Sequence, residues 1–134
     1  MSQANVEVIR QGWDAWLRGD LPRLFGYFDA EVVWDTSNFR DWPEAGYHGR
    51  AGVERFLSEW LAVWDDYELR VDDVFAAPDG RVVSLIHHRG KGRESGLPLD
   101  MEMAQIATVR DGKVTRLDNY DDRAQALEAV GLRE

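Results

Sequence analysis

The stretch "ATVRDGKVTRLDNYDD", residues 107–122, holds two β-like runs on either side of the dipeptide Asp111-Gly112. Asp-Gly between two such runs is a strong signal for a tight turn, so the stretch predicts a β-hairpin. Its second strand ends in polar groups: Arg116, Asp118, Asn119, Tyr120 and Asp121. Such a strand is either a solvated edge, protected by its charges, or has one face on a cavity that needs polar atoms.

Further β-like segments precede the hairpin. Residues 31–36, 67–76 and 81–89 are short and rich in Val, Phe, Trp or Ile, which is typical of strands. The strands of the hairpin itself cover 99–110 and 113–120. The spacing and the tight turns favour an antiparallel arrangement of most of these strands.

Helical periodicity occurs mainly in the first half of the chain. The clearest helix covers residues 50–65, where apolar side chains recur three and four positions apart. A first helix is predicted over 3–18, and a short second one after Asp20, with an apolar stripe that reaches Phe28. A last helix is predicted over 122–130. Helices that precede a run of strands predict the α+β class, with helices packed on one face of a curved sheet.

The composition limits the classes of function. The chain has 134 residues, 44% of them hydrophobic, which predicts one domain, 1–134, with a packed core. Its net charge of −9 argues against nucleic acid and membrane partners, because phosphates repel an acidic surface. The chain has no cysteine and no basic-then-apolar start, so we expect a cytoplasmic protein without thiol chemistry.

Five motifs together resemble the SnoaL-like proteins of the NTF2-like superfamily. They are "GDLPRLFGYFDAEVVWDT", "YHGRAGVERFL", "RGKGRESG", "AQIATVRDGKVTRLDNYDD" and "ALEAVGL". The resemblance implies a cone formed by a curved antiparallel or mixed sheet, with three helices on its concave face and a short C-terminal helix. It also implies an internal pocket and a homodimer through the outer sheet face. Ketosteroid isomerase, polyketide cyclases, limonene epoxide hydrolase and non-catalytic binding modules share this fold, so fold alone does not settle function.

Asp35 is the first catalytic candidate. The resemblance places it where ketosteroid isomerase keeps its general base. A carboxylate among apolar side chains loses hydration, which raises its pKa and suits it to accept a proton near neutral pH. The alternative is that Asp35 caps the turn that follows it.

His87 is the second catalytic candidate. Strand alternation sends His87 and Arg89 to one face and His88 to the other. Both faces are apolar upstream, so periodicity leaves open which one lines the cone, and the resemblance favours His87 inward. Arg89 would then reproduce, with Asp35, part of an epoxide hydrolase relay. The alternative is a structural histidine at a dimer face.

Two amides are candidates for binding a ligand oxygen. Gln105 shares a strand face with apolar neighbours, and an amide on such a face is costly unless it finds partners. Asn119 lies where the resemblance places the catalytic aspartate of polyketide cyclases, and an amide cannot act as a base. Structural hydrogen bonds for Gln105 and a solvated edge for Asn119 are the alternatives.

Aromatic side chains are the candidate walls of the pocket: Trp13, Trp16, Trp34, Phe56, Trp60 and Trp64. His48, in the loop predicted for residues 37–49, is a candidate for the pocket mouth or a turn residue. No metal or cofactor is expected, because adjacent strand residues such as His87 and His88 point in opposite directions.

These features predict a protein that holds a small hydrophobic, oxygenated molecule, such as a steroid, terpenoid or polyketide. The predicted function is acid/base chemistry of the isomerase, cyclase or hydrolase type. The alternative is a non-catalytic binding or dimerisation module.

Overall fold

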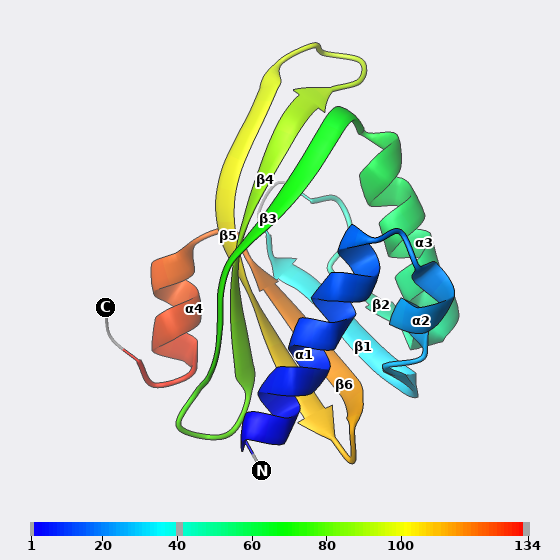
Figure 1. Cartoon of the computed structure of the whole chain (residues 1–134). Coiled ribbons are helices and arrows are strands. Elements are labelled where there is room, and N and C mark those ends of the chain that lie inside the picture. Colours follow the sequence, from blue (N-terminus) through cyan, green and yellow to red (C-terminus); the bar gives the residue numbers. More distant parts are fainter. Residues whose placement is uncertain (1, 40–41, 133–134) are drawn as a thin grey trace.

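A six-stranded curved sheet forms the centre of the computed structural model, which describes residues 2–39 and 42–132 (Figure 1). The strands lie in the order β2-β1-β6-β5-β4-β3. Their bounds are β1 Phe28–Asn38, β2 Gly46–His48, β3 Trp64–Ala76, β4 Val82–Gly92, β5 Pro98–Arg110 and β6 Lys113–Tyr120. The pair β1–β6 is parallel and the other pairs are antiparallel, so the sheet is mixed.

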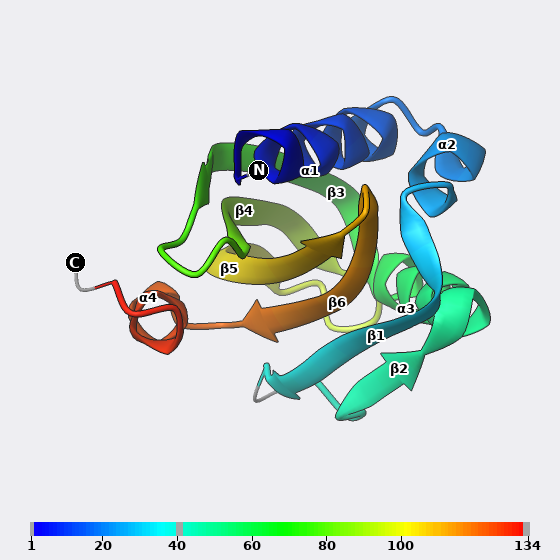
Figure 2. The ribbon, with the colours of Figure 1, turned by 90° about the horizontal axis from the view of Figure 1, so that it is seen from below.

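Four helices in the described residues cover the two faces of this sheet unequally. They are α1 Ser2–Leu17, α2 Leu21–Phe25, α3 Gly49–Ala62 and α4 Arg123–Ala129. The first three lie on the concave side, whereas α4 lies on the opposite side (Figures 1 and 2). The predicted α+β class is therefore confirmed. No helix in the described part combines the length and the apolar character needed to cross a bilayer.

The hairpin predicted at Asp111-Gly112 is present. Both residues have positive φ, 52° and 77°, as a two-residue turn of this type requires. The turn joins β5 to β6 and pairs Arg110 with Lys113. A register shift between Thr108 and Val109 then moves the pairing by one residue and places Gln105 opposite Asn119, on the same sheet face.

The main differences from the predicted elements lie around β1 and at the start of β3. β1 begins at Phe28, which was expected in the second helix, because the chain turns into the sheet directly after Gly26. The predicted loop 37–49 contains β2, a strand of three residues, and its residues 40 and 41 lie outside the described chain. β3 begins at Trp64, which was expected in the preceding helix.

Two apolar clusters explain why β4 and β5 are apolar on both faces. The larger cluster lies between the concave face and α1–α3. The smaller one joins Val83, Ala104 and Ile106 of the convex face to Ala126 and Val130 from α4 and its end. Because α4 covers the convex face here, apolar residues on that face do not need a partner subunit.

Candidate ligand-binding cavity

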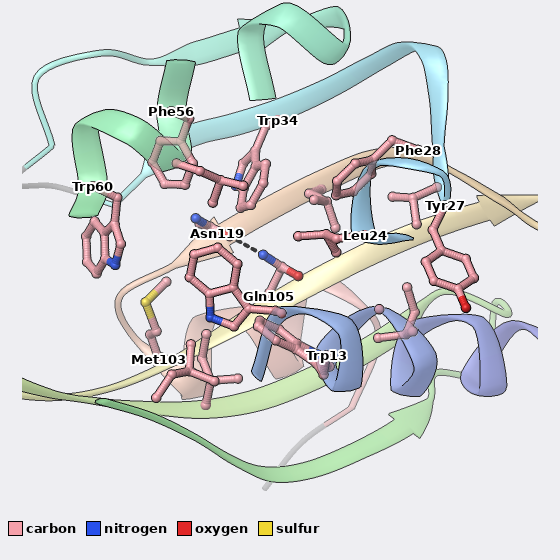
Figure 3. Close-up of a pocket in the computed structure, with 18 of the residues that line it drawn as sticks. Trp13, Leu24, Tyr27, Phe28, Trp34, Phe56, Trp60, Met103, Gln105 and Asn119 are labelled. Atoms are coloured by element: carbon pink, nitrogen blue, oxygen red, sulfur yellow. Dashed lines mark hydrogen bonds between the residues drawn. The ribbon is translucent and has the colours of Figure 1, made fainter. Parts of the chain in front are cut away.

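A cavity of about 90 Å³ lies between the concave face of the sheet and the helices α1–α3 (Figure 3). Its wall is mostly apolar, and no carboxylate, lysine or arginine of the described residues lines it. It is smaller than the roughly 150 Å³ cavity known to admit benzene. A larger ligand therefore needs wall side chains to move or an extension outside the cavity.

Aromatic rings form much of the wall. The sequence-predicted wall residues Trp13, Trp16, Trp34, Phe56 and Trp60 line the cavity. The rings of Trp34 and Phe56 lie 4.6 Å apart between centroids, so β1 and α3 meet through them. Trp64, the sixth, packs edge-on against the Trp60 ring at 5.4 Å and stands behind the wall.

The buried amides Gln105 and Asn119 form a pair on the cavity floor. Gln105 Nε2 donates to Asn119 Oδ1 at 3.1 Å (Figure 3). Within the described chain, Gln105 Oε1 and Asn119 Nδ2 have no hydrogen-bond partner, and both residues line the cavity. If both amides flip, the bond between them is kept and its direction reverses. The pair therefore presents one amide NH₂ group and one amide oxygen that have no partner, in either arrangement.

His88, and not His87, is the histidine that lines the cavity. Burial, with a smaller contribution from the His87 charge, lowers the pKa of His88 to about 4, so its ring is neutral at pH 7. Its Nδ1 lies within hydrogen-bonding distance of the Tyr67 hydroxyl, and its Nε2 lies 3.0 Å from the Met103 sulfur. The tautomer that fits both contacts accepts from Tyr67 at Nδ1 and carries its proton on Nε2, because the thioether sulfur has no proton to donate and can only accept.

A further hydrogen bond ties α1 to the sheet beside the cavity. Trp13 Nε1 donates to Ser84 Oγ at 2.9 Å. Ser84 is opposite Gln105 in the register of β4 and β5, and Gln105 is opposite Asn119. A row of small polar side chains thus crosses the inner face of three strands, and the Trp13 indole satisfies one end of it.

Asp35 lies on the other side of the sheet from the cavity. Its Oδ1 accepts from the backbone N–H of Ser37 at 2.8 Å, which is the turn-capping geometry. Its Oδ2 accepts from Arg116 Nη2 at 2.8 Å. Burial alone raises the pKa of Asp35, but the Ser37 hydrogen bonds and the Arg116 charge outweigh it, so the net pKa is lowered. The structure thus does not bring Asp35 together with the two amides.

His87 also points away from the cavity. It bonds to Asp100 through Nε2, and Arg70 Nη2 lies 3.0 Å from its Nδ1. With Asp72 and Glu102 it forms a group of possible metal ligands whose atoms lie within 4.8 Å of one another. Asp72 already accepts from two guanidinium groups. Those two positive charges oppose a cation there, so this cluster is better explained as an ion-pair network.

The remaining predicted residues lie outside the cavity as well. His48 is exposed at the end of β2 and makes no side-chain cap on α3. Arg89 is exposed on the same face of β4 as His87 and lines a separate groove. The functional roles assigned to Asp35, His87, His48 and Arg89 remain predictions, and the geometry groups none of these residues with the cavity.

His88 and Tyr67 are two of the cavity residues that the sequence interpretation missed, and they form a hydrogen-bonded pair. His88 shares its strand face with Ser84 and Ile86, and that face already contained a polar side chain among apolar ones. A polar side chain on an apolar strand face had identified Gln105. The same pattern is present on β4 and could have identified His88.

Comparisons with known proteins place this geometry in context. A family model described as a SnoaL-like domain matches residues 9–117. An uncharacterized protein of Mycobacterium tuberculosis is 28% identical, and the alignment covers 94% of this chain and 95% of that protein.

Solved structures show the same fold. An NTF2-like protein of unknown function from Burkholderia pseudomallei has a TM-score of 0.73 at 18% identity, covering 96% of this chain and 98% of the other. A protein from Catenulispora acidiphila with a ketosteroid isomerase-like fold, in complex with trimethylamine, has a TM-score of 0.70 at 18% identity, covering 94% and 93%. At these identities the likeness establishes the NTF2-like fold and leaves the activity open.

Proposed function

The chain belongs to the SnoaL-like domain family, and from that premise we propose that it binds a small, mainly apolar molecule carrying a polar oxygen. The observation that carries the proposal is the Gln105–Asn119 pair, buried on the floor of an aromatic cavity with one donor and one acceptor unpaired. The apolar wall supplies the affinity for the body of the ligand, and the amides orient its oxygen.

The energetics of the amides support a ligand that can form hydrogen bonds. A buried polar group without a partner costs about 1–3 kcal/mol, whereas the same group bonded contributes about 1 kcal/mol. A ligand carbonyl or hydroxyl removes that cost, and a hydrocarbon of equal shape does not. We expect the cavity to prefer the oxygenated member of an isosteric pair by about tenfold, which corresponds to ~1.4 kcal/mol.

Cyclopentanone and methylenecyclopentane are a suitable probe pair, because they differ little in shape and only the ketone accepts a hydrogen bond. Their dissociation constants are measured by titration, following backbone and tryptophan indole NMR signals. In the double variant Gln105→Met/Asn119→Leu we expect the preference for the ketone to disappear while the alkene still binds. Exposed Gln125 on α4 provides the control: Gln125→Met should retain the preference. If neither probe binds the wild-type chain at millimolar concentration, the cavity is not a ligand site.

Proton transfer is the second candidate function, favoured by one observation. His88 presents a neutral ring to the cavity beside Tyr67, so it is able to accept a proton. A base with a pKa near 4 holds a proton weakly at neutral pH, and catalytic bases usually have a pKa close to the working pH. For this reason binding without turnover is better supported than acid/base catalysis.

Deuterium exchange separates these two functions. Cyclopentanone in D₂O exchanges its α-hydrogens slowly, and a base placed beside the bound ketone accelerates this exchange. We expect the wild-type chain to bind the ketone without accelerating exchange. Acceleration that is lost in His88→Gln would instead establish proton abstraction and overturn our preference for the binder.

A further inference from the structure

A second hollow, a groove of about 620 Å³, adjoins the inner cavity. It lies at the ends of α1 and α3 and at the start of α2, and it passes around the edge strand β3, so that residues of both sheet faces line it. Trp16, Tyr67 and Leu69 line both the groove and the cavity, so these three side chains form the partition between them. All three side chains are half-buried, and none belongs to the fully buried core.

The rim of the groove is unusually apolar for an exposed surface. Leu17, Leu21 and Leu61 line it with 55%, 37% and 38% of their surfaces exposed. They come from three different helices and meet at one opening. Exposed apolar patches occur at protein–protein contacts and in ligand-binding grooves, and the hollow favours a ligand here.

The far side of the groove carries two arginines, Arg70 and Arg89, and one carboxylate, Glu68. Arg89 lines the groove, and its guanidinium makes no hydrogen bond or ion pair in the described part of the chain, although the carboxylate of Asp100, opposite it in the β4–β5 register, interacts with its charge. Arg70 lies beside it but is held by Asp72 and His87. Glu68 is opposite Arg89 in the β3–β4 register, yet no ion pair joins the two side chains.

We propose that the groove is the mouth of the cavity and that the natural ligand carries a carboxylate, or a similar anionic group, that binds Arg89. The apolar body of the ligand lies against the leucine rim and passes the partition of Trp16, Tyr67 and Leu69 to reach the amide pair. This inference rests on the proposed function, because it describes which molecules the same cavity takes.

Two observations favour an anionic end over a second neutral group. The inner cavity of about 90 Å³ is too small for a drug-sized ligand, and pockets for such ligands usually measure roughly 300–1,000 Å³. Any larger ligand must therefore extend into the groove. There the free guanidinium offers a forked set of donors that matches a carboxylate. Glu68 weakens this attraction, and its removal should strengthen anion binding.

The test compares 4-phenylbutyrate with its neutral analogue 4-phenylbutanamide in the intact chain, by NMR titration or calorimetry at low salt. We expect the carboxylate to bind about fivefold more tightly, as a partly exposed charge pair allows. Arg89→Gln should remove this difference and leave the affinity for the amide unchanged. Glu68→Gln should increase the difference.

Arg110 provides the matched control. It is exposed and without a partner in the described residues, and it lies at the β5–β6 turn. Arg110→Gln changes the net charge by the same amount as Arg89→Gln, and it should retain the preference for the carboxylate. Equal binding of both probes to the wild type, or equal losses in the two variants, would overturn the role of Arg89 and leave the cavity proposal intact. Absence of binding by both probes, together with failure of the cyclopentanone pair, would remove the proposed function itself.

Discussion

At the scale of single residues, the burial of His88 should make the stability of the fold depend on pH. The pKa of His88 is about 4 in the folded chain and about 6.5 when unfolded. Between pH 4 and pH 6.5, His88 is protonated in the unfolded chain but neutral in the folded chain. The contribution of His88 to the free energy of unfolding is therefore complete above pH 6.5 and is lost as the pH falls toward 4. The loss is of the order of 3 kcal/mol.

The measurement is the free energy of unfolding in urea at pH 7.5 and at pH 4.5. We expect His88→Gln to be less stable than the wild type at pH 7.5 and to lose less stability on acidification. The carboxylates contribute equally to both proteins, so the difference isolates His88. Exposed His48 supplies the control, because His48→Gln should follow the wild type. Parallel pH profiles for the wild type and His88→Gln would contradict this account.

Single residues also show how far the sequence predicts the site. The apolar neighbours of Gln105 indicated a cavity amide, and the structure places it there. They did not show that Asn119 would be its partner, because that depends on the β5–β6 register. The inward histidine could not be chosen by periodicity, since α4 makes the outer face of β4 apolar as well.

At the scale of secondary-structure elements, α1 carries a glycine in its interior, where glycine has a lower helix propensity than alanine. Gly12 lies within the helix and lines the cavity, and a Cβ added there would meet Leu24 Cδ1 at an ordinary 3.8 Å. Gly12→Ala should stabilise the fold by about 1 kcal/mol, the difference in helix propensity. Gly12→Leu should fill the cavity and weaken cyclopentanone binding. Thermal unfolding and the ketone titration measure the two effects, and a destabilised Gly12→Ala chain would contradict the prediction.

The helix α4 should contribute to stability through one buried face. Ala126 is fully buried and shares a cluster with Val83 and Ile106, whereas Ala124 on the same helix is exposed. Ala126→Asp places a carboxylate against apolar side chains, and we expect it to cost more than about 2 kcal/mol. Ala124→Asp, in the first turn, should change stability by less than about 0.5 kcal/mol. Equal costs in urea unfolding would mean that α4 does not cover the sheet.

Elements of clear periodicity were predicted within a few residues, and short ones were not. The predicted 50–65 helix is α3, Gly49–Ala62. β2 has only three residues and forms because Tyr47 pairs with Trp34 of β1, a contact that no local pattern contains. Phe28 fits the apolar stripe of a short helix as well as it fits a strand. In the structure it lies in β1, where its ring packs against Trp34. Tertiary contacts therefore determine the secondary structure of segments that are too short to show a hydrophobic periodicity.

At the scale of the whole molecule, the cone leaves two surfaces that could join two copies of the chain. The outer sheet face, expected to form the homodimer, is covered by α4 where it is apolar and carries ion pairs elsewhere, such as Arg116 with Asp35 and Asp118. The other surface is the leucine rim of the groove. Salt should distinguish them, because it screens exposed charges and strengthens apolar association.

We predict a homodimer through the outer sheet face, which should weaken as the salt concentration rises from about 0.05 M to about 1 M, where the screening length falls to roughly 3 Å. Sedimentation velocity over a range of protein concentrations measures the dissociation constant. Leu61→Lys, on the rim, should leave this dimer unchanged. A dimer that tightens with salt and is lost in Leu61→Lys would place the contact at the groove, where it would also block the proposed mouth. A monomer under all conditions would exclude both contacts and leave the groove open to solvent.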